Sequence, residues 1–209
     1  MKIIFHKMSK KYPNTIYGFK DSIRYGYRKF ELDVRGCKDR LIIYHDHVCN
    51  NEYIENINFY DLKDVDLLDD FIIEANKHSN LEIYLDIKGN SIPDVNKLIS
   101  VLGKFSNNNN IFVQSFNIDV LKKLTTYSRS IKTGLIVAGF HDILFKNLKY
   151  VNYLVIEEEF IDKYLDIDID KYLYTVNLDH KTKQYENYGV KGIFTDYPLK
   201  FLQFNYEKY

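Results

Sequence analysis

The stretch that decides the fold is KFELDVRGCKDRLIIYHD, residues 29–46. Its first part alternates, so apolar side chains occupy one face of a strand and the carboxylates of Glu31 and Asp33 lie next to each other on the other face. Two like charges on an otherwise apolar strand are unfavourable unless an opposite charge neutralises them, and a metal ion can do so. The stretch therefore predicts a metal site, with a solvated acidic face as the alternative.

The second part of the same stretch predicts a hairpin. Residues 36–40 have the composition of a turn, and residues 41–44 run back as an apolar strand to His45 and Asp46. The turn lies about midway between Glu31 and His45, so pairing of the two arms returns His45 to the level of the carboxylates. We expect an imidazole beside the cation site, with an ordinary hydrogen-bonded surface histidine as the alternative.

Length and composition are those of one domain, spanning residues 1–209. Hydrophobic residues make up 45% of the chain and charged residues 28%, and 29 basic residues balance 29 acidic ones. Zero net charge gives no reason to expect nucleic acid or an anionic membrane as partner.

Cys37 and Cys49 form no disulfide framework, which favours a reducing compartment. The apolar run near the start is too short for a signal peptide or a membrane span. We expect a cytoplasmic location, and the composition does not address the oligomeric state.

Strand-like and helix-like segments alternate along nearly the whole chain. Beside the Glu31 strand and its return arm at 41–44, the patterns predict strands at residues 2–6, 81–88, 111–115, 132–138, 153–157, 172–177 and 192–196. They predict helices at residues 15–25, 67–78, 93–105, 118–127, 142–148, 160–165, 180–188 and 198–206, with Asn14 and Thr15 as starting residues of the first and Asn117 as the cap of the fourth.

This alternation is typical of βαβ units and a parallel sheet. Without the antiparallel return arm eight strands remain, which predicts an α/β fold: a single-domain (β/α)8 TIM barrel with a short β-hairpin arm after the second strand. An open doubly wound sheet is the competitor. It is disfavoured because no glycine-rich phosphate loop follows the first strand.

Polar side chains collect at the predicted carboxyl ends of the strands, where β/α barrels carry their chemistry. The residues expected there are His6, Glu31, Asp33, His45, Asp86 and Lys88, followed by Ser115, Asn177 and Asp196 on later strands. Three carboxylates make an oxygen-rich site that suits Mg²⁺ or Ca²⁺, and two histidines can act as general acid and base. Lys7 and Lys88 can neutralise an anion. Together these groups fit cleavage of a phosphodiester.

The same residues resemble the glycerophosphodiester phosphodiesterase family, which belongs with the phosphatidylinositol-specific phospholipase C barrels. Its motifs occur in order along the chain: a strand ending at His6, then YPNT at 12–15, ELDV at 31–34, HD at 45–46, DIK at 86–88, QSF at 114–116, TVN at 175–177 and a final segment matching at 189–198. Each motif alone is weak, but their order together is specific.

The resemblance implies roles for these positions. It implies one divalent cation, Mg²⁺ or Ca²⁺, on Glu31, Asp33 and Asp86, with His6 and His45 as general acid and base in an order that the sequence does not decide. It also implies a small-molecule glycerophosphodiester substrate such as glycerophosphocholine, split to glycerol 3-phosphate and an alcohol.

Two further functions stay open. A lysophospholipase D or sphingomyelinase D-like activity would keep the metal and the histidines and act on a lysophospholipid head group, but no exposed apolar loop suited to membrane docking is evident. A phosphodiester-binding barrel with little or no turnover is the other. It stays open because Lys7 replaces the family's arginine and Pro13 its glutamate, while Asp86 is one methylene shorter than the usual Glu.

Overall fold

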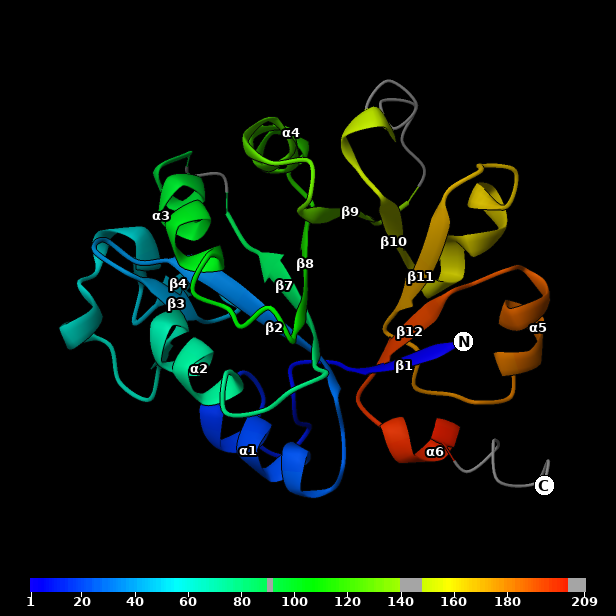
Figure 1. Cartoon of the computed structure of the whole chain (residues 1–209), viewed down its shortest axis with the longest axis horizontal. Helices are drawn as coiled ribbons and strands as arrows, with labels where there is room; N and C mark the ends of the chain where they lie inside the picture. Colours follow the sequence, from blue (N-terminus) through cyan, green and yellow to red (C-terminus); the bar gives the residue numbers. More distant parts are fainter. Residues whose placement is uncertain (90–91, 140–147, 203–209) are drawn as a thin grey trace.

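A closed ring of eight parallel strands forms the centre of the protein in the computed structural model, which describes residues 1–89, 92–139 and 148–202 (Figure 1). The barrel strands are β1 (Lys2–Phe5), β2 (Lys29–Gly36), β7 (Glu82–Ile87), β8 (Asn110–Ser115), β9 (Lys132–Val137), β10 (Tyr153–Glu157), β11 (Asp170–Tyr174) and β12 (Gly192–Thr195). The ring closes because β1 pairs with β12 on one side and with β2 on the other, where Phe5 lies opposite Phe30. The predicted barrel is confirmed.

Helices cover the outside of the ring (Figure 1). They are α1 (Ile16–Arg24), α2 (Leu68–Ala75), α3 (Ile92–Leu102), α4 (Ile118–Tyr127), α5 (Thr182–Asn187) and α6 (Pro198–Leu202). Helix α1 begins after Thr15, whose hydroxyl accepts a hydrogen bond from the Gly18 N–H, and α4 begins after Asn117, which caps the Asp119 N–H. The helix predicted at 160–165 is a 3-10 helix at Glu158–Tyr164. The helix predicted at 142–148 lies outside the described residues except for Leu148, which begins a 3-10 helix at Leu148–Tyr150, and the end of the last predicted helix also lies outside them.

The alternation of β2 divides its side chains between two environments. Phe30, Leu32 and Val34 are buried in the apolar layer between the strands and the helices, where Phe19 of α1 and Phe71 of α2 also pack. The carboxylates of the same strand therefore point into the barrel.

Aromatic rings fill the interior of the barrel. Tyr84, Tyr153, Tyr172 and Phe194 belong to one buried cluster, and the partly buried Phe112 packs against it, with the centroids of the stacked Tyr84 and Phe112 rings 4.5 Å apart. On each strand, the next inward residue lies two positions further toward the carboxyl end. The aromatic layer thus forms a floor, and the polar side chains above it meet at the open end.

The predicted hairpin arm is confirmed. β3 (Leu41–Ile43) runs antiparallel to β2, with Ile43 opposite Val34, and β6 (Asp66–Leu67) pairs with β3 in turn. The segment between them, expected as a loop or small excursion, contains a two-stranded sheet of β4 (Val48–Cys49) and β5 (Glu52–Tyr53) and two short 3-10 helices (Ile54–Asn56 and Phe59–Asp61). Cys37 and Cys49 are both free thiols. None of the helices in the described ranges has the length and apolar character that a membrane span requires.

Candidate active site

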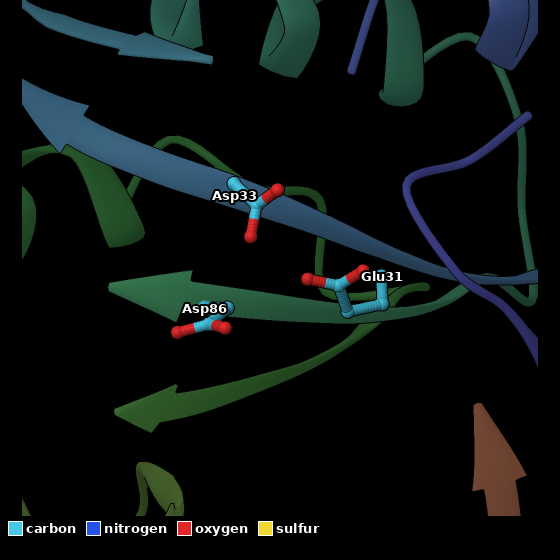
Figure 2. Close-up of side chains that lie close together, drawn as sticks. All are labelled: Glu31, Asp33 and Asp86. Atoms are coloured by element: carbon cyan, nitrogen blue, oxygen red, sulfur yellow. The ribbon is translucent and has the colours of Figure 1, made fainter. Parts of the chain in front are cut away.

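Three carboxylates converge at the mouth of the barrel (Figure 2). Glu31 and Asp33 come from β2 and Asp86 from β7, and strand pairing sets Asp33 directly beside Asp86. One oxygen from each residue lies within 4.8 Å of the others, and the three residues are only 2%, 1% and 6% exposed. The shorter side chain at Asp86 therefore still reaches the cluster. The structure brings together all three residues that the sequence predicted as metal ligands.

The three carboxylates are buried close together, and the positive charge around them is too small to offset their repulsion. Burial, with the neighbouring Asp33 charge, raises the pKa of Glu31 to about 8, although the Lys7 backbone N–H donates to Glu31 Oε2 at 2.8 Å. Burial raises the pKa of Asp86 to about 6, against the opposing effect of Lys88. Asp86 Oδ1 is buried and has no hydrogen-bond partner among the described residues. An oxygen-only donor set with an unsatisfied buried acceptor fits a hard divalent cation.

Two lysines border the triad. Lys88 Nζ lies 2.6 Å from Asp86 Oδ2 and 3.0 Å from Asp33 Oδ1, and Lys7 Nζ lies 3.9 Å from Asp33 Oδ2. Burial alone would raise the pKa of Asp33, but Lys88, a hydrogen bond from Asn14 and Lys7 hold it below its ordinary value. Burial likewise opposes the charge on Lys88, yet the two aspartates raise its pKa overall. Both predicted lysines are thus at the site, and their role toward substrate stays a prediction.

Asn14 holds one of the carboxylates in place. Its Nδ2 donates to Asp33 Oδ2 at 2.6 Å, and its Oδ1 accepts the Asp33 backbone N–H at 3.0 Å. Its backbone φ of 55° lies in the left-handed region, which asparagine tolerates better than most residues. The sequence indicated Asn14 only as a helix-start residue, and this second role was missed. The sequence alone does not show that this loop asparagine bonds to a buried acid on a strand, because the pairing depends on where the loop lies in the fold.

His6 is oriented by the carboxylate of Asp196, which directly follows the last strand, β12. Its Nδ1 lies 2.7 Å from Asp196 Oδ1, and its Nε2 lies 4.0 Å from Glu31 Oε2. Asn177 Nδ2 donates to the other oxygen of Asp196 at 2.8 Å. With Nδ1–H donated to Asp196, Nε2 is the ring nitrogen on the side of the triad. The sequence placed Asp196 and Asn177 at the carboxyl ends of later strands, and the contacts of Asp196 with His6 and with Asn177 were not foreseen.

The charge around His6 favours its imidazolium form. Burial alone would lower the pKa of His6, but the hydrogen bond to Asp196 and the nearby charges of Glu31 and Asp196 raise it above its ordinary value. The same hydrogen bond lowers the pKa of Asp196. A half-buried histidine with a carboxylate partner is a suitable proton donor or acceptor.

His45 reaches the same pocket from the hairpin arm. The backbone of Tyr44 donates to the carbonyl of Asp33 at 3.1 Å, which returns the chain to the level of the triad as predicted. The His45 side chain is 50% exposed, and its Nδ1 lies 2.8 Å from Asp46 Oδ1. Arg35 Nη2 donates to its carbonyl at 2.9 Å. The two histidines thus differ in environment, with His6 enclosed and His45 open to solvent.

All seven predicted site residues line one cavity of ≈ 280 Å³ at the mouth. The charged part of the lining consists of the triad, both lysines and both histidines. Apolar and aromatic side chains complete it, namely Phe116, Ile136, Val155, Tyr174 and Phe194, and Lys88 Nζ lies 5.9 Å from the centroid of the Phe116 ring. A compact cavity lined by both charged and apolar groups suits a small phosphodiester with a non-phosphate substituent.

Residues 8–200 match the family model described as the Glycerophosphoryl diester phosphodiesterase family. The chain belongs to this family. The match runs over almost the whole chain and includes every predicted site residue except His6 and Lys7, which directly precede it. The family and enzyme class that the sequence predicted are therefore confirmed.

Relatives of this family share sequence and fold with the chain along its length. The Bacillus subtilis (strain 168) protein named "Putative glycerophosphodiester phosphodiesterase YhdW" is 24% identical, and the match covers 95% of both chains. A crystal structure of a glycerophosphodiester phosphodiesterase from Parabacteroides distasonis superposes with a TM-score of 0.85 at 18% identity, covering 99% of this chain and 97% of the other. An Oleispira antarctica phosphodiesterase in complex with the product sn-glycerol-3-phosphate gives 0.86 at 18% identity, covering 97% and 96%. At these identities the solved structures show a shared fold.

Proposed function

We propose that this glycerophosphodiester phosphodiesterase hydrolyses small glycerophosphodiesters to glycerol 3-phosphate and an alcohol, with one divalent cation on Glu31, Asp33 and Asp86. The observation that carries the proposal is the convergence of these three buried carboxylates with both predicted histidines in one cavity. The glycerol 3-phosphate in the Oleispira antarctica structure supports the identity of the product.

The triad would hold Mg²⁺ or Ca²⁺ through carboxylate oxygens, with water as the remaining ligands. When bound, such an ion offsets the negative charge of the phosphate oxygens. The raised pKa of Glu31 and the unsatisfied Oδ1 of Asp86 support the assignment, because both are relieved by a cation at this point.

The two lysines bind the phosphate from the rim of the triad. Lys88 is held by Asp33 and Asp86, so its ammonium is fixed without an ordering step when substrate arrives. Lys7 lies in the left-handed region at φ 52° and directs its backbone N–H to Glu31, while its Nζ stays near Asp33. The side chain supplies positive charge where the family motif has an arginine.

Proton transfer is assigned to His6 and His45. As the bond from the attacking hydroxyl oxygen to phosphorus forms, that hydroxyl loses a proton, and as the bond to the departing alcohol oxygen breaks, that oxygen gains one. One imidazole accepts the first proton and the other donates the second. Asp196 orients the His6 ring, because its hydrogen bond with Nδ1 leaves Nε2 directed toward the triad.

The test is release of glycerol 3-phosphate from glycerophosphocholine with Mg²⁺ or Ca²⁺, with and without a chelator. We expect turnover that the chelator abolishes, and a loss of about 10²-fold or more in kcat for His6→Ala and for His45→Ala. Asp33→Asn should also abolish cation-dependent turnover, whereas Asp70→Asn on the exposed side of α2 serves as the matched control. Turnover that survives both histidine changes would contradict the acid–base assignment. Turnover of lysophosphatidylcholine in place of glycerophosphocholine would support the lysophospholipase D alternative.

A further inference from the structure

His45 lies on an irregular segment of the chain. Strand β3 ends at Ile43 and β4 begins at Val48, so residues 44–47 belong to neither a strand nor a helix. The His45 side chain is 50% exposed, and its ring partner Asp46 is 70% exposed. A contact between two exposed side chains restrains a ring weakly, whereas a group that transfers protons needs a fixed position. The position of this ring therefore depends on how the main chain of the segment is held.

Arg35 binds the main chain of this segment from the end of β2. It lies two residues beyond Asp33 on the same strand, so it shares the strand parity of Glu31 and Asp33. Its Nη2 donates a hydrogen bond to the His45 carbonyl at 2.9 Å. Arg35 thus connects the strand that carries two members of the triad to a residue assigned to proton transfer.

The guanidinium of Arg35 is held on several sides. An added Cβ at Gly89, which follows β7 with a φ of 91°, would lie 3.5 Å from Arg35 Nη1, so this nitrogen rests against the turn after β7. Arg35 Nε is buried and has no hydrogen-bond partner among the described residues. Four carboxylates favour the charge against burial, those of Asp33, Asp46, Glu55 and Asp86. A planar guanidinium enclosed in this way fixes the carbonyl that it binds.

Resting on the proposed hydrolysis, we propose that Arg35 is a positioning residue for proton transfer. Its guanidinium fixes the main chain at His45 and thereby sets where the imidazole lies relative to the phosphate. The described residues that line the cavity include His45 but not Arg35, so Arg35 acts from behind the ring and not on the substrate. Its effect should appear in kcat and should pass through His45.

Arg35→Met tests this role, because methionine removes every donor and keeps an unbranched side chain. We expect kcat for glycerophosphocholine to fall about 10- to 100-fold, the usual effect of losing a group that orients another. KM should change little, since Lys7 and Lys88 remain to bind the phosphate. A raised KM with an unchanged kcat would place Arg35 in substrate binding and overturn the proposal.

Cation affinity shows whether the triad itself is disturbed. In Arg35→Met the three carboxylates remain and one nearby positive charge is lost, so the affinity for Mg²⁺, measured by titration calorimetry, should not fall. A weaker affinity would mean that the substitution acts on the triad, and it would overturn the assignment to His45.

A double-mutant cycle with His45 is the sharpest readout, because a general loss of structure would not reproduce it. In His45→Ala the imidazole is absent, so adding Arg35→Met should leave the residual kcat unchanged. A residual kcat that falls by the same factor as in the unaltered enzyme would show that Arg35 acts independently of His45, and it would overturn the proposal.

Arg28→Met is the matched control. Arg28 Nη1 donates to the Tyr27 carbonyl at 2.8 Å, which is the same kind of contact, but Arg28 is exposed and directly precedes β2, at the end of the strand away from the mouth. This variant should keep kcat and KM at their original values.

Arg35→Lys is the second variant, and the thermal midpoint of each variant checks its folding. Lysine keeps the positive charge among the four carboxylates but lacks the planar fork, so kcat should fall here too. A kcat equal to that of the unaltered enzyme would overturn the role of the guanidinium.

Two results separate this inference from the function on which it rests. Turnover that Arg35→Met leaves unchanged would overturn the role of Arg35 and leave the hydrolysis intact. Absence of glycerol 3-phosphate release by the unaltered enzyme would overturn both, because Arg35 would then have no proton transfer to support.

Discussion

At the scale of single residues, the neighbours of each carboxylate decide what it can do. Asp33 has two lysines and an asparagine around it and stays ionised, whereas Glu31 and Asp86 are buried with too little positive charge. Adjacent acids in such unequal environments are typical of a site that binds a cation. Residues that hold the carboxylates should therefore affect cation affinity without touching the ion.

Asn14→Gly removes both hydrogen bonds to Asp33 and keeps the left-handed backbone accessible. We expect the affinity for Mg²⁺ or Ca²⁺, measured by titration calorimetry, to fall about 10- to 100-fold, the usual effect of losing a group that orients a ligand. Asn51→Gly is the matched control, because Asn51 also has a positive φ of 66° but lies exposed in the β4–β5 turn. Equal affinities in the two variants would contradict the role of Asn14.

Asp196→Asn tests how His6 is prepared. Loss of the carboxylate removes the charge that favours the imidazolium, so the pKa of His6, followed by NMR titration of the ring, should move to lower pH. We expect kcat to fall by about 10²-fold because the ring is no longer held with Nε2 toward the triad. Asp168→Asn on the surface is the control. An unchanged His6 titration in Asp196→Asn would contradict the assignment.

The positions of most site residues could be predicted from the strands, but several of their partners could not. Glu31 and Asp33 occupy the polar face of an alternating strand, and Asp86 does the same on the next barrel strand, so the two-residue period alone aims them inward. Asp196 was expected at the mouth, but its contact with His6 joins residues 190 positions apart in the sequence. The hydrogen bonds from Asn14 to Asp33 likewise depend on where the loop before α1 lies, which is a tertiary property.

At the scale of elements, the barrel depends on side-chain volume inside the ring. Gly134 on β9 lies directly under the ring of Tyr153, and a Cβ there would overlap that ring. Gly192 plays the same part for Tyr172. Small residues on one strand thus accept large rings from the next, and the aromatic floor positions the polar layer above it.

Gly134→Ala should destabilise the protein by about 1 to 3 kcal/mol, because the added methyl group forces the Tyr153 ring to move within a packed interior. The measurement is the free energy of unfolding in urea. Gly103→Ala is the control, since a Cβ at Gly103 meets nothing within 4 Å. Two variants of equal stability would contradict the packing described for the floor.

Element types followed from the sequence more reliably than element ends. The strand at 153–157 and the helix at 118–127 were predicted with their observed bounds. The helix predicted from residue 67 begins at Leu68, because Leu67 pairs with β3 as part of β6. The small sheet of β4 and β5 was not predicted. Two-residue strands carry no periodic signal, and these two pair across a tight turn at Asn50 and Asn51, whose φ angles are both positive.

At the scale of the whole molecule, the buried acids link stability to pH and to the cation. The pKa of Glu31 is about 8 in the folded protein against an ordinary 4.5, and that of Asp86 is about 6. Between the ordinary and the folded values, the folded state binds more protons than the unfolded state, so stability falls as pH rises. His6, with its raised pKa, acts in the same direction.

The cation-free protein should therefore lose stability as pH rises from about 5 to 8, measured as the free energy of unfolding in urea. Added Mg²⁺ or Ca²⁺ favours the ionised carboxylates, so the same ion concentration should raise the thermal midpoint more at pH 8 than at pH 6. In Glu31→Gln the pH dependence should be weaker. Stability that increases over this interval without the cation would contradict the picture.

The central claim is that Glu31, Asp33 and Asp86 hold one divalent cation at the barrel mouth. The most direct measurement is anomalous diffraction from crystals soaked in Mn²⁺ as a substitute for Mg²⁺, with Asp33→Asn crystals treated in parallel. We predict one strong peak bounded by oxygens of all three carboxylates in the unaltered protein and a weak peak or none in the variant. No peak at the triad, or a peak that persists undiminished in Asp33→Asn, would contradict the claim.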